Sequence, residues 1–272
     1  MKITATVITL NEERNIEAAL GSISIVDEIV VVDSGSTDAT VALARKYTDN
    51  VITHEWPGYA AQKNFAAQQA SNDWIFNLDA DERLTPELAR EIEALRARPE
   101  PEACGFEMPR LCFYKGRWIR HSGWYPDYKV RLYDRRSAEW EGNFVHESVS
   151  VHGKTGRLRG DLLHYTADSA SEHHLRMDRY TTLAAQESLT QGKRVSAGSI
   201  LFSPPAAFIR SYFLKLGFLD GVPGLAIASF AAHYVFLKKL KIWEQWMSAS
   251  SEAEAEILPQ RRRDTRRVRG ED

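Results

Sequence analysis

Several features that would place a protein in a class at once are scarce in this chain. Only two cysteines, Cys104 and Cys112, occur in 272 residues, which excludes a disulfide framework, and their spacing does not suit a zinc site. The 35 basic and 37 acidic residues leave a net charge of −2, so no global basic field predicts a nucleic-acid partner. The N-terminal residues contain no apolar run followed by a small-residue cleavage site, which predicts a cytoplasmic protein.

Glycine-rich phosphate-binding signatures are absent as well. The chain contains neither G-x-G-x-x-G nor G-x-x-x-x-G-K-[ST], so the dinucleotide-binding and P-loop classes lose their main sequence support.

The first hundred residues alternate strand and helix patterns. Residues 3–10, 29–32 and 74–78 are apolar or β-branched runs typical of strands buried on both faces. This alternation predicts an α/β fold with a mostly parallel sheet and a nucleotide-sized crevice at the carboxyl ends of its strands. Strand-like pieces then alternate with aromatic and glycine-rich loops up to about residue 200, which predicts an irregular second half of the same domain.

Acidic side chains stand where the predicted strands end. Asp79 and Asp81 follow one buried run, and side chains at i and i+2 on extended backbone point the same way, so both can approach one ligand. At the mouth of an α/β sheet that ligand would be Mg²⁺ or Mn²⁺ bridging a diphosphate. Asp33 ends another run and can accept from a ribose hydroxyl or a base N–H. The alternative is that these acids only close turns or cap helices.

Together these motifs resemble a known family. Four segments stand in the order and spacing of family 2 inverting glycosyltransferases with the GT-A fold: residues 7–12, 29–38, 62–64 and 78–82. Residues 140–147 and the pair His164-Tyr165 resemble the subgroup of β-1,4-glucosyltransferases of lipopolysaccharide core biosynthesis. The resemblance implies a donor half at about residues 1–100 and an acceptor half at about residues 101–200.

The resemblance also implies an activity and its residues. The enzyme would use a divalent metal, Mg²⁺ or Mn²⁺, to move one sugar, glucose being favoured, from a UDP-sugar to a lipid-linked saccharide such as lipopolysaccharide inner core. Glu147 would be the general base, with Asp127 as second choice, and the missing Gln-x-x-Arg-Trp motif argues against a processive polymerase. The nucleotide-sugar ligands would be Asn11, Glu12, Asp33, Lys63, Asp79 and Arg131. The metal ligands would be Asp81, Asp79 and His164.

Two other functions remain open on the sequence. A polyprenyl-phosphate glycosyltransferase would attack with a phosphate oxygen and would need no general base. A catalytically silent, membrane-attached carbohydrate-binding scaffold would keep the fold without the reaction. The intact Asp79 and Asp81 count against the scaffold.

The C-terminal part of the chain is unusually apolar. Residues 222–237 contain no Asp, Glu, Lys or Arg and are followed by lysines, yet they fall short of the roughly 20 residues that span a bilayer. A buried core helix and a membrane span are alternatives, but the pattern favours an amphipathic, membrane-interface segment at residues 201–247, with residues 208–246 on the lipid surface. Residues 248–272 carry six arginines between 261 and 269, which predicts a disordered Arg-rich tail attracted to anionic lipid. The expected location is the inner face of a bacterial inner membrane, by peripheral association.

Overall fold

The computed structural model describes residues 1–98, 101–142, 147–166 and 169–269, with side chains described up to residue 248. It divides into two compact units, unit 1 at Met1–Asp168 and unit 2 at Ser169–Asp272.

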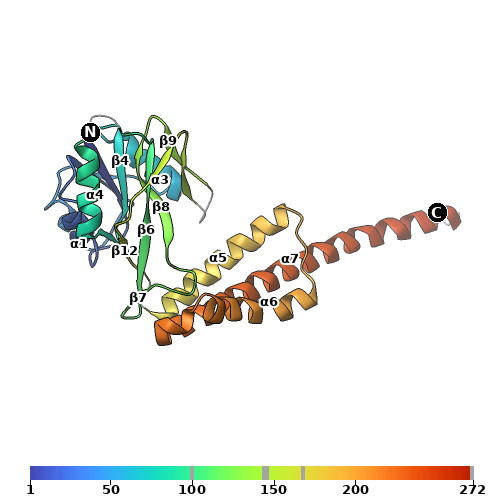
Figure 1. Ribbon diagram of the computed structural model, residues 1–272. Helices are drawn as coiled ribbons and strands as arrows, with labels where there is room; N and C mark the ends of the chain where they lie inside the picture. The colour runs from blue at the N-terminus through green and yellow to red at the C-terminus, as the bar shows by residue number, and fades with distance from the viewer. Residues whose placement is uncertain (99–100, 143–146, 167–168, 270–272) are drawn as a thin grey trace. The chain divides into compact units, whose positions relative to one another are not determined.

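Unit 1 is built on a ten-stranded sheet flanked by helices (Figure 1). Its N-terminal half has the strand order β3-β2-β1-β4, and these four strands are all parallel. Their bounds are β1 Ile3–Thr9, β2 Glu28–Asp33, β3 Val51–Thr53 and β4 Trp74–Asp79. β1 is buried at every position, because alternate residues such as Val7 and Ile8 belong to core clusters on opposite faces of the sheet.

Four helices complete this half of unit 1. They are α1 Ile16–Ser22, α2 Thr40–Ala44, α3 Tyr59–Gln68 and α4 Pro86–Arg96. α4 begins with a cap that its local sequence supplies: Thr85 Oγ1 accepts a hydrogen bond of 3.2 Å from the Leu88 N–H, and Pro86 occupies the first turn.

The second half of unit 1 mixes strand directions. β8 (Asp127–Asp134) is antiparallel to β4 and to β6 (Gly105–Tyr114), and β12 (Leu162–Tyr165) lies parallel to β6 and antiparallel to β5 (Glu82–Leu84). The shorter strands β7 Arg117–Ile119 and β11 Thr155–Arg157 also pair with β6, while β9 Ala138–Glu141 and β10 Ser148–Val151 form a separate hairpin. The predicted α/β fold, with a parallel first half and an irregular second half, is confirmed.

Unit 2 is helical throughout its described residues. It contains α5 Ala170–Thr190, α6 Ala197–Ile209, the π-helical turn η1 Arg210–Leu214, the 3-10 turn η2 Gly217–Asp220 and α7 Gly221–Arg269. The boundary between the two units lies at residues 168–169, because α5 groups with unit 2, whereas the predicted domain boundary is near residue 200. The reason is packing: α5 lies against α7, and Lys241 Nζ on α7 donates to Asp178 Oδ1 at 2.6 Å and to Thr181 Oγ1 at 2.9 Å on α5.

α7 differs from the expectation in two respects. Its backbone is helical to Arg269, whereas the composition predicts disorder from residue 248; Ala, Glu and Arg, which are frequent there, all favour helix. Among the described residues, Gly217–Ser248 is also long and apolar enough to cross a membrane by length and composition alone, at a mean hydropathy of 1.2. Only 22% of its apolar window is buried, which disfavours the buried-core alternative.

Candidate active site

The carboxyl ends of β1, β2 and β4 bring the predicted donor-site residues to one edge of the sheet. Thr9 of β1 pairs with Asp33 of β2, and Ile8 pairs with Asp79 of β4, so the two acids flank the end of β1. This is the edge at which open α/β sheets bind ligands.

Asp33 closes a turn, which is the alternative role that the sequence analysis gave for the strand-end acids. Its Oδ2 accepts from the Gly35 and Ser36 N–H groups, both at 2.9 Å. Asn11 joins this turn to the loop after β1, because its Oδ1 accepts from the Thr37 N–H at 2.8 Å. Both residues therefore shape the rim of the crevice, and direct contact with a nucleoside stays a prediction.

Glu12 belongs to the same rim. Its N–H donates to Thr40 Oγ1 at 2.7 Å, and its carboxylate accepts from Asn15 Nδ2 at 2.9 Å.

Asp79 lies between two buried cations. Lys63 Nζ of α3 is 2.9 Å from Asp79 Oδ1, and Arg131 Nη2 of β8 is 2.6 Å from Asp79 Oδ2. Burial would raise the pKa of Asp79, but the charges of Arg131 and Lys63 outweigh it and hold that pKa well below its usual range. The same carboxylate raises the pKa of the Arg131 guanidinium against its burial. The Asp79 carboxylate and the Arg131 guanidinium therefore each stabilise the charged form of the other.

Lys63 connects this cluster to the hairpin of the second half. Its Nζ lies 4.2 Å from the centroid of the Trp140 ring and 3.8 Å from Glu147 Oε1. Asn64, the next residue, exchanges two hydrogen bonds of 2.9 Å with the Trp140 backbone. The structure thus brings the predicted base Glu147 to the predicted diphosphate ligand Lys63, across more than eighty residues of sequence.

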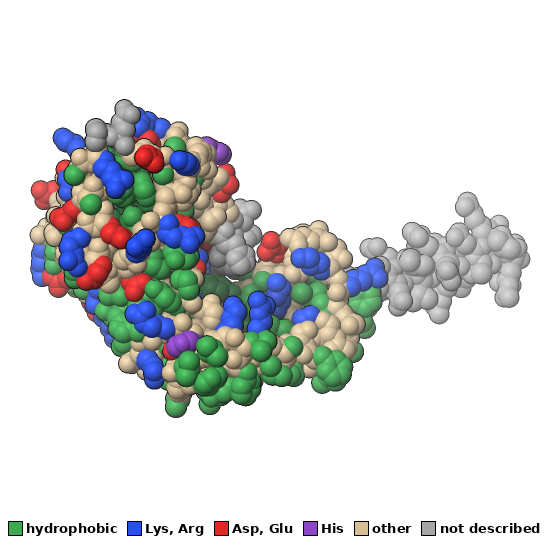
Figure 2. Space-filling model, viewed as in Figure 1, with side chains coloured by type: hydrophobic (Ala, Val, Ile, Leu, Met, Phe, Trp, Pro, Cys, Tyr) green, Lys and Arg blue, Asp and Glu red, His purple; other side chains and the backbone are tan. Residues whose placement is uncertain are grey.

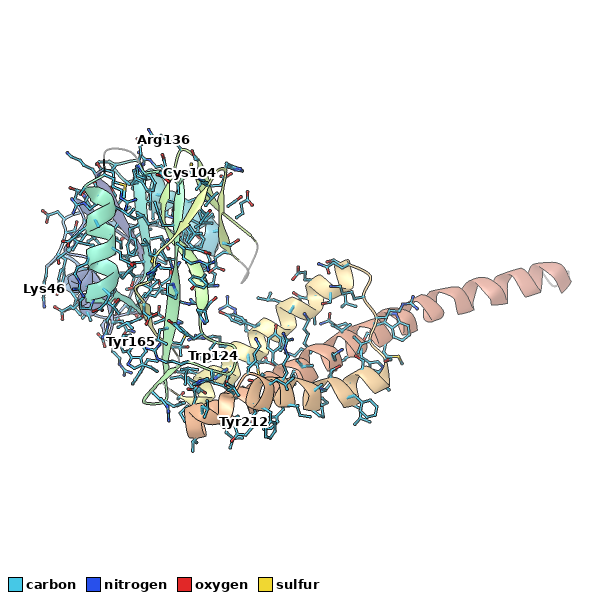
Figure 3. All side chains as sticks on the ribbon, in the orientation of Figure 1. Lys46, Cys104, Trp124, Arg136, Tyr165 and Tyr212 are labelled. Atoms are coloured by element: carbon cyan, nitrogen blue, oxygen red, sulfur yellow. The ribbon has the colours of Figure 1, made fainter. Side chains whose placement is uncertain are left out.

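Asp81 and His164 form the second predicted group. His164 Nε2 lies 3.1 Å from Asp81 Oδ2, and His164 Nδ1 lies 3.4 Å from the Cys112 thiol. Burial lowers the pKa of His164, but the Asp81 carboxylate more than compensates and raises it to about 10. The Tyr165 N–H donates to the Asp81 carbonyl at 2.9 Å, and Tyr165, labelled in Figure 3, marks this end of β12.

Of the three predicted metal ligands, Asp81 and His164 face each other, whereas Asp79 is engaged by other residues. A carboxylate and a neutral imidazole facing each other fit a divalent cation, and Asp81 and His164 offer that pair once His164 gives up the proton that Asp81 stabilises. Both Asp79 oxygens are engaged by Lys63 and Arg131, which makes Asp79 a weaker candidate for direct ligation. Among the described residues, the one trio of potential ligands within 4.8 Å of one another is Glu139, Glu141 and His152, which are all exposed.

Glu82 and Arg110 are site residues that the sequence interpretation missed. Glu82 is fully buried; its Oε1 lies 2.6 Å from Arg131 Nη2 and 3.7 Å from Arg110 Nη1, and its Oε2 accepts from the Asp79 N–H at 3.1 Å. Arg110 also binds Asp127 Oδ2 at 2.7 Å, directly across the β6–β8 pair. The sequence signal that could have identified Glu82 is its position as a third acid immediately after Asp79-Ala80-Asp81.

Both carboxylate oxygens of Asp127, the second choice for the base, are in ion pairs. Arg110 engages Oδ2, and Lys129 Nζ lies 3.2 Å from Oδ1. The separation of 3.8 Å between Glu147 and Lys63 is longer than a hydrogen bond. Of the two carboxylates, Glu147 has the looser ion-pair contacts among the described residues.

Comparison with known proteins identifies the family. The model of Glycosyl transferase family 2 matches residues 4–148, a range that holds every predicted site residue except His164. The lipopolysaccharide core biosynthesis glycosyltransferase LpsC of Rhizobium meliloti is 34% identical over 252 residues, which cover 90% of this chain and 93% of that protein. An uncharacterized glycosyltransferase of Rickettsia typhi is 31% identical over 254 residues, covering 89% of this chain and 87% of that protein.

Solved structures give a more partial likeness. Glucosyl-3-phosphoglycerate synthase from Mycobacterium tuberculosis, in complex with Mg²⁺ and uridine diphosphate, is 25% identical with a TM-score of 0.34, covering 40% of this chain and 43% of that chain.

Proposed function

The chain belongs to glycosyl transferase family 2 and is an inverting glycosyltransferase, and from this premise we propose that it transfers one sugar from a UDP-sugar to a lipid-linked saccharide. The observation that carries the proposal is the Lys63–Asp79–Arg131 cluster at the strand ends, with Glu147 beside it. Glucose is the sugar we favour, on the sequence resemblance alone. Lipopolysaccharide inner core is the acceptor we favour, and similarity to LpsC, a glycosyltransferase of lipopolysaccharide core biosynthesis, supports a core acceptor.

Lys63 and Arg131 act on the donor. Both are cations buried at the crevice, where fixed positive charge is worth more than in water. They stabilise the negative charge that grows on the departing UDP as the bond from the anomeric carbon to the diphosphate oxygen breaks. Asn11, Glu12, Asp33 and Asp79 shape or line the same donor pocket.

Asp81 and His164 would hold a divalent cation, Mg²⁺ or Mn²⁺. When bound, such an ion neutralises diphosphate charge and helps UDP to leave. With Asp79 committed to Lys63 and Arg131, we assign it to positioning those cations in preference to direct ligation.

Glu147 removes the acceptor proton. The acceptor hydroxyl oxygen attacks the anomeric carbon from the face opposite UDP, its proton passes to the Glu147 carboxylate, and the bonding pair leaves with UDP. A single displacement inverts the configuration, so no covalent enzyme intermediate is formed. Asp127, held by Arg110 and Lys129, remains in an ion pair.

The reaction takes place at the cytoplasmic face of a bacterial inner membrane. Residues 208–246 and the Arg-rich C-terminal segment would bind the membrane surface peripherally, because a lipid-linked acceptor is held in that surface. The apolar character of Gly217–Ser248 supports this location.

Ligand-dependent thermal stability tests the donor site. A ligand at about 100 times its Kd stabilises a protein by roughly 2.7 kcal/mol, so UDP and one UDP-sugar should raise the melting temperature with Mn²⁺ but not with EDTA. The effect should be lost in Asp81→Ala and kept in Glu139→Gln, which alters the exposed trio instead. No response to any nucleotide would contradict the proposal.

UDP release in the presence of acceptor separates the remaining alternatives. The proposal predicts release with a saccharide acceptor that depends on Glu147. Release onto polyprenyl phosphate that survives in Glu147→Gln would identify the phosphate-acceptor enzyme. Sugar binding without release from any donor–acceptor pair would identify the scaffold.

A further inference from the structure

We propose that one face of α6 and η1 enters the surface of a lipid bilayer that carries anionic headgroups. The inference rests on the membrane location proposed above and names the part of unit 2 that makes the contact. The α6–η1 face consists of Leu201, Phe202, Pro205, Ala206, Ile209, Phe213 and Leu214.

The exposed positions of this segment follow a helical repeat. Between residues 201 and 214 they are 201, 202, 205, 206, 209, 210, 213 and 214, which is one continuous face. Seven of these eight residues are apolar, and Arg210 is the exception. A helix of a soluble protein turns its polar side outward, and here the outward side is the apolar one.

The exposure of this face is large. The relative exposures of Leu214, Phe202 and Leu201 are 75%, 71% and 65%. Fourteen of the seventeen large hydrophobic residues exposed in the described structure belong to unit 2, and Figure 2 shows hydrophobic side chains gathered along the lower edge of α6 and its neighbouring turns. Contiguous apolar surface of this kind marks a partner or a membrane.

The charged residues near the face in the chain favour an anionic partner. From residue 188 to 222 the charged residues are Lys193, Arg194, Arg210, Lys215 and Asp220. Asp220 is buried, so the segment shows cations and no exposed acid. Cations beside an inserted apolar face suit anionic lipid headgroups. A second copy of this chain docked by two-fold symmetry would instead bring together two surfaces that both carry exposed cations and no exposed acid.

The turn beyond the face is held firmly. Leu216 adopts a left-handed conformation at φ 55° and directs the chain into η2. There the Gly217 carbonyl packs so closely on Gly224 of α7 that a Cβ on Gly224 would lie 1.9 Å from it. Phe218 and Val222, which follow the face in the chain, are both exposed, and the Phe218 ring lies 6.3 Å from the Tyr212 ring of η1, so exposed apolar side chains continue into the turn.

Vesicle flotation of the full chain tests the proposal. The wild-type protein should float with vesicles of phosphatidylcholine and phosphatidylglycerol, more weakly with phosphatidylcholine alone, and less at high salt. The double variant Phe202→Glu, Leu214→Glu should partition at least about tenfold less, because two apolar anchors become anions. Arg210→Gln and Lys215→Gln should each weaken binding about fivefold, and only to the anionic vesicles.

Leu175→Glu is the matched control. Leu175 is 69% exposed on α5, in the same unit but outside the face, so its replacement should leave flotation unchanged. The Arg-rich C-terminal segment is identical in all these chains, so differences between them report the face alone. Equal flotation of the double variant and wild type would overturn the proposal, as would an equal loss in Leu175→Glu.

Two further measurements keep the outcomes separate. If sedimentation velocity shows a wild-type dimer that the double variant abolishes, the face is an interface between copies and the proposal fails. The UDP-induced rise in melting temperature should be the same in wild type and the double variant. If wild type floats but shows no UDP response, the proposed function fails while the membrane face stands.

Discussion

The two units differ in the kind of destabilising side chain that they contain. Unit 1 buries charge: Lys63, Glu82 and Arg131 are almost completely removed from water, Lys63 and Arg131 both contact Asp79, and Arg131 also contacts Glu82 directly. Unit 2 exposes apolar surface, with Leu214 and Phe202 among its most exposed residues. Burying ions and exposing hydrophobic side chains both oppose stability in water. The contrast indicates that each unit is built for a partner, a charged one in unit 1 and an apolar one in unit 2.

The largest expected effect concerns activity at the charged cluster. Glu147→Gln keeps the shape of the side chain but cannot take a proton, so kcat should fall by about 10²–10⁴ while the UDP-induced thermal shift is retained. Steady-state UDP release measures this. Glu139→Gln, an exposed acid on β9, should be fully active, and equal activity in the two variants would remove Glu147 from its role.

The next effect concerns the stability of unit 1. Glu82→Gln leaves Arg131 and Arg110 without their shared buried counter-charge, which should cost about 3–5 kcal/mol of unfolding free energy. Urea titration followed by circular dichroism measures it. Glu87→Gln breaks the exposed pair with Arg90 on α4 and should cost less than about 1 kcal/mol. Similar losses in both would show that burial does not distinguish these ion pairs.

A smaller effect is expected at the link between α3 and the β9–β10 hairpin. Asn64→Ala removes both hydrogen bonds to the Trp140 backbone, which should cost about 1–3 kcal/mol. Because Trp140 stacks under Lys63, KM for the UDP-sugar should rise more than kcat falls. A variant with lowered stability and an unchanged KM would separate the hairpin from the donor site.

The smallest effect is expected in unit 2. Leu214→Ser replaces a highly exposed side chain and should change the unfolding free energy by no more than about 0.5 kcal/mol. Leu88→Ala, at a fully buried position of unit 1, should cost about 2–5 kcal/mol. Thermal unfolding of the two variants compares them directly. A large loss in Leu214→Ser would mean that this leucine is packed and that the α6–η1 face is part of the fold.

Local sequence patterns predicted the parallel half of the fold well. The apolar runs of β1, β2 and β4 are long enough to report burial on both faces, and the Thr85-Pro86 cap is a short-range signal. The same strand ends placed Asp79 beside the end of β1, although Lys63 and Arg131 reached it from α3 and β8. The sequence therefore predicts which residues lie at strand ends. Which residues contact them from other elements depends on how the strands and helices pair, and the sequence does not show this.

The features that the sequence did not predict depend on the pairing of distant strands or on helices whose sequence is atypical. Arg110 meets Asp127 because β6 and β8 pair antiparallel, and no local pattern contains that information. The sequence predicted an amphipathic segment from residue 201 but not which α6 side chains face outward, because Pro204 and Pro205 lie inside the helix, where proline removes a backbone donor and argues against helix. The boundary at residue 169 was missed because an amphipathic α5 can cover a sheet or another helix equally well.

The order of the two units along the chain also sets the order in which they leave the ribosome. Unit 1 ends at residue 168, so all of its strands have been synthesised before the first residue of the α6–η1 face is added. Chains fold domain by domain during synthesis, N-terminal part first. The apolar α6–η1 face therefore leaves the ribosome after every strand of unit 1, and on the membrane contact proposed above this order shortens the time that the face spends in water before it can reach lipid.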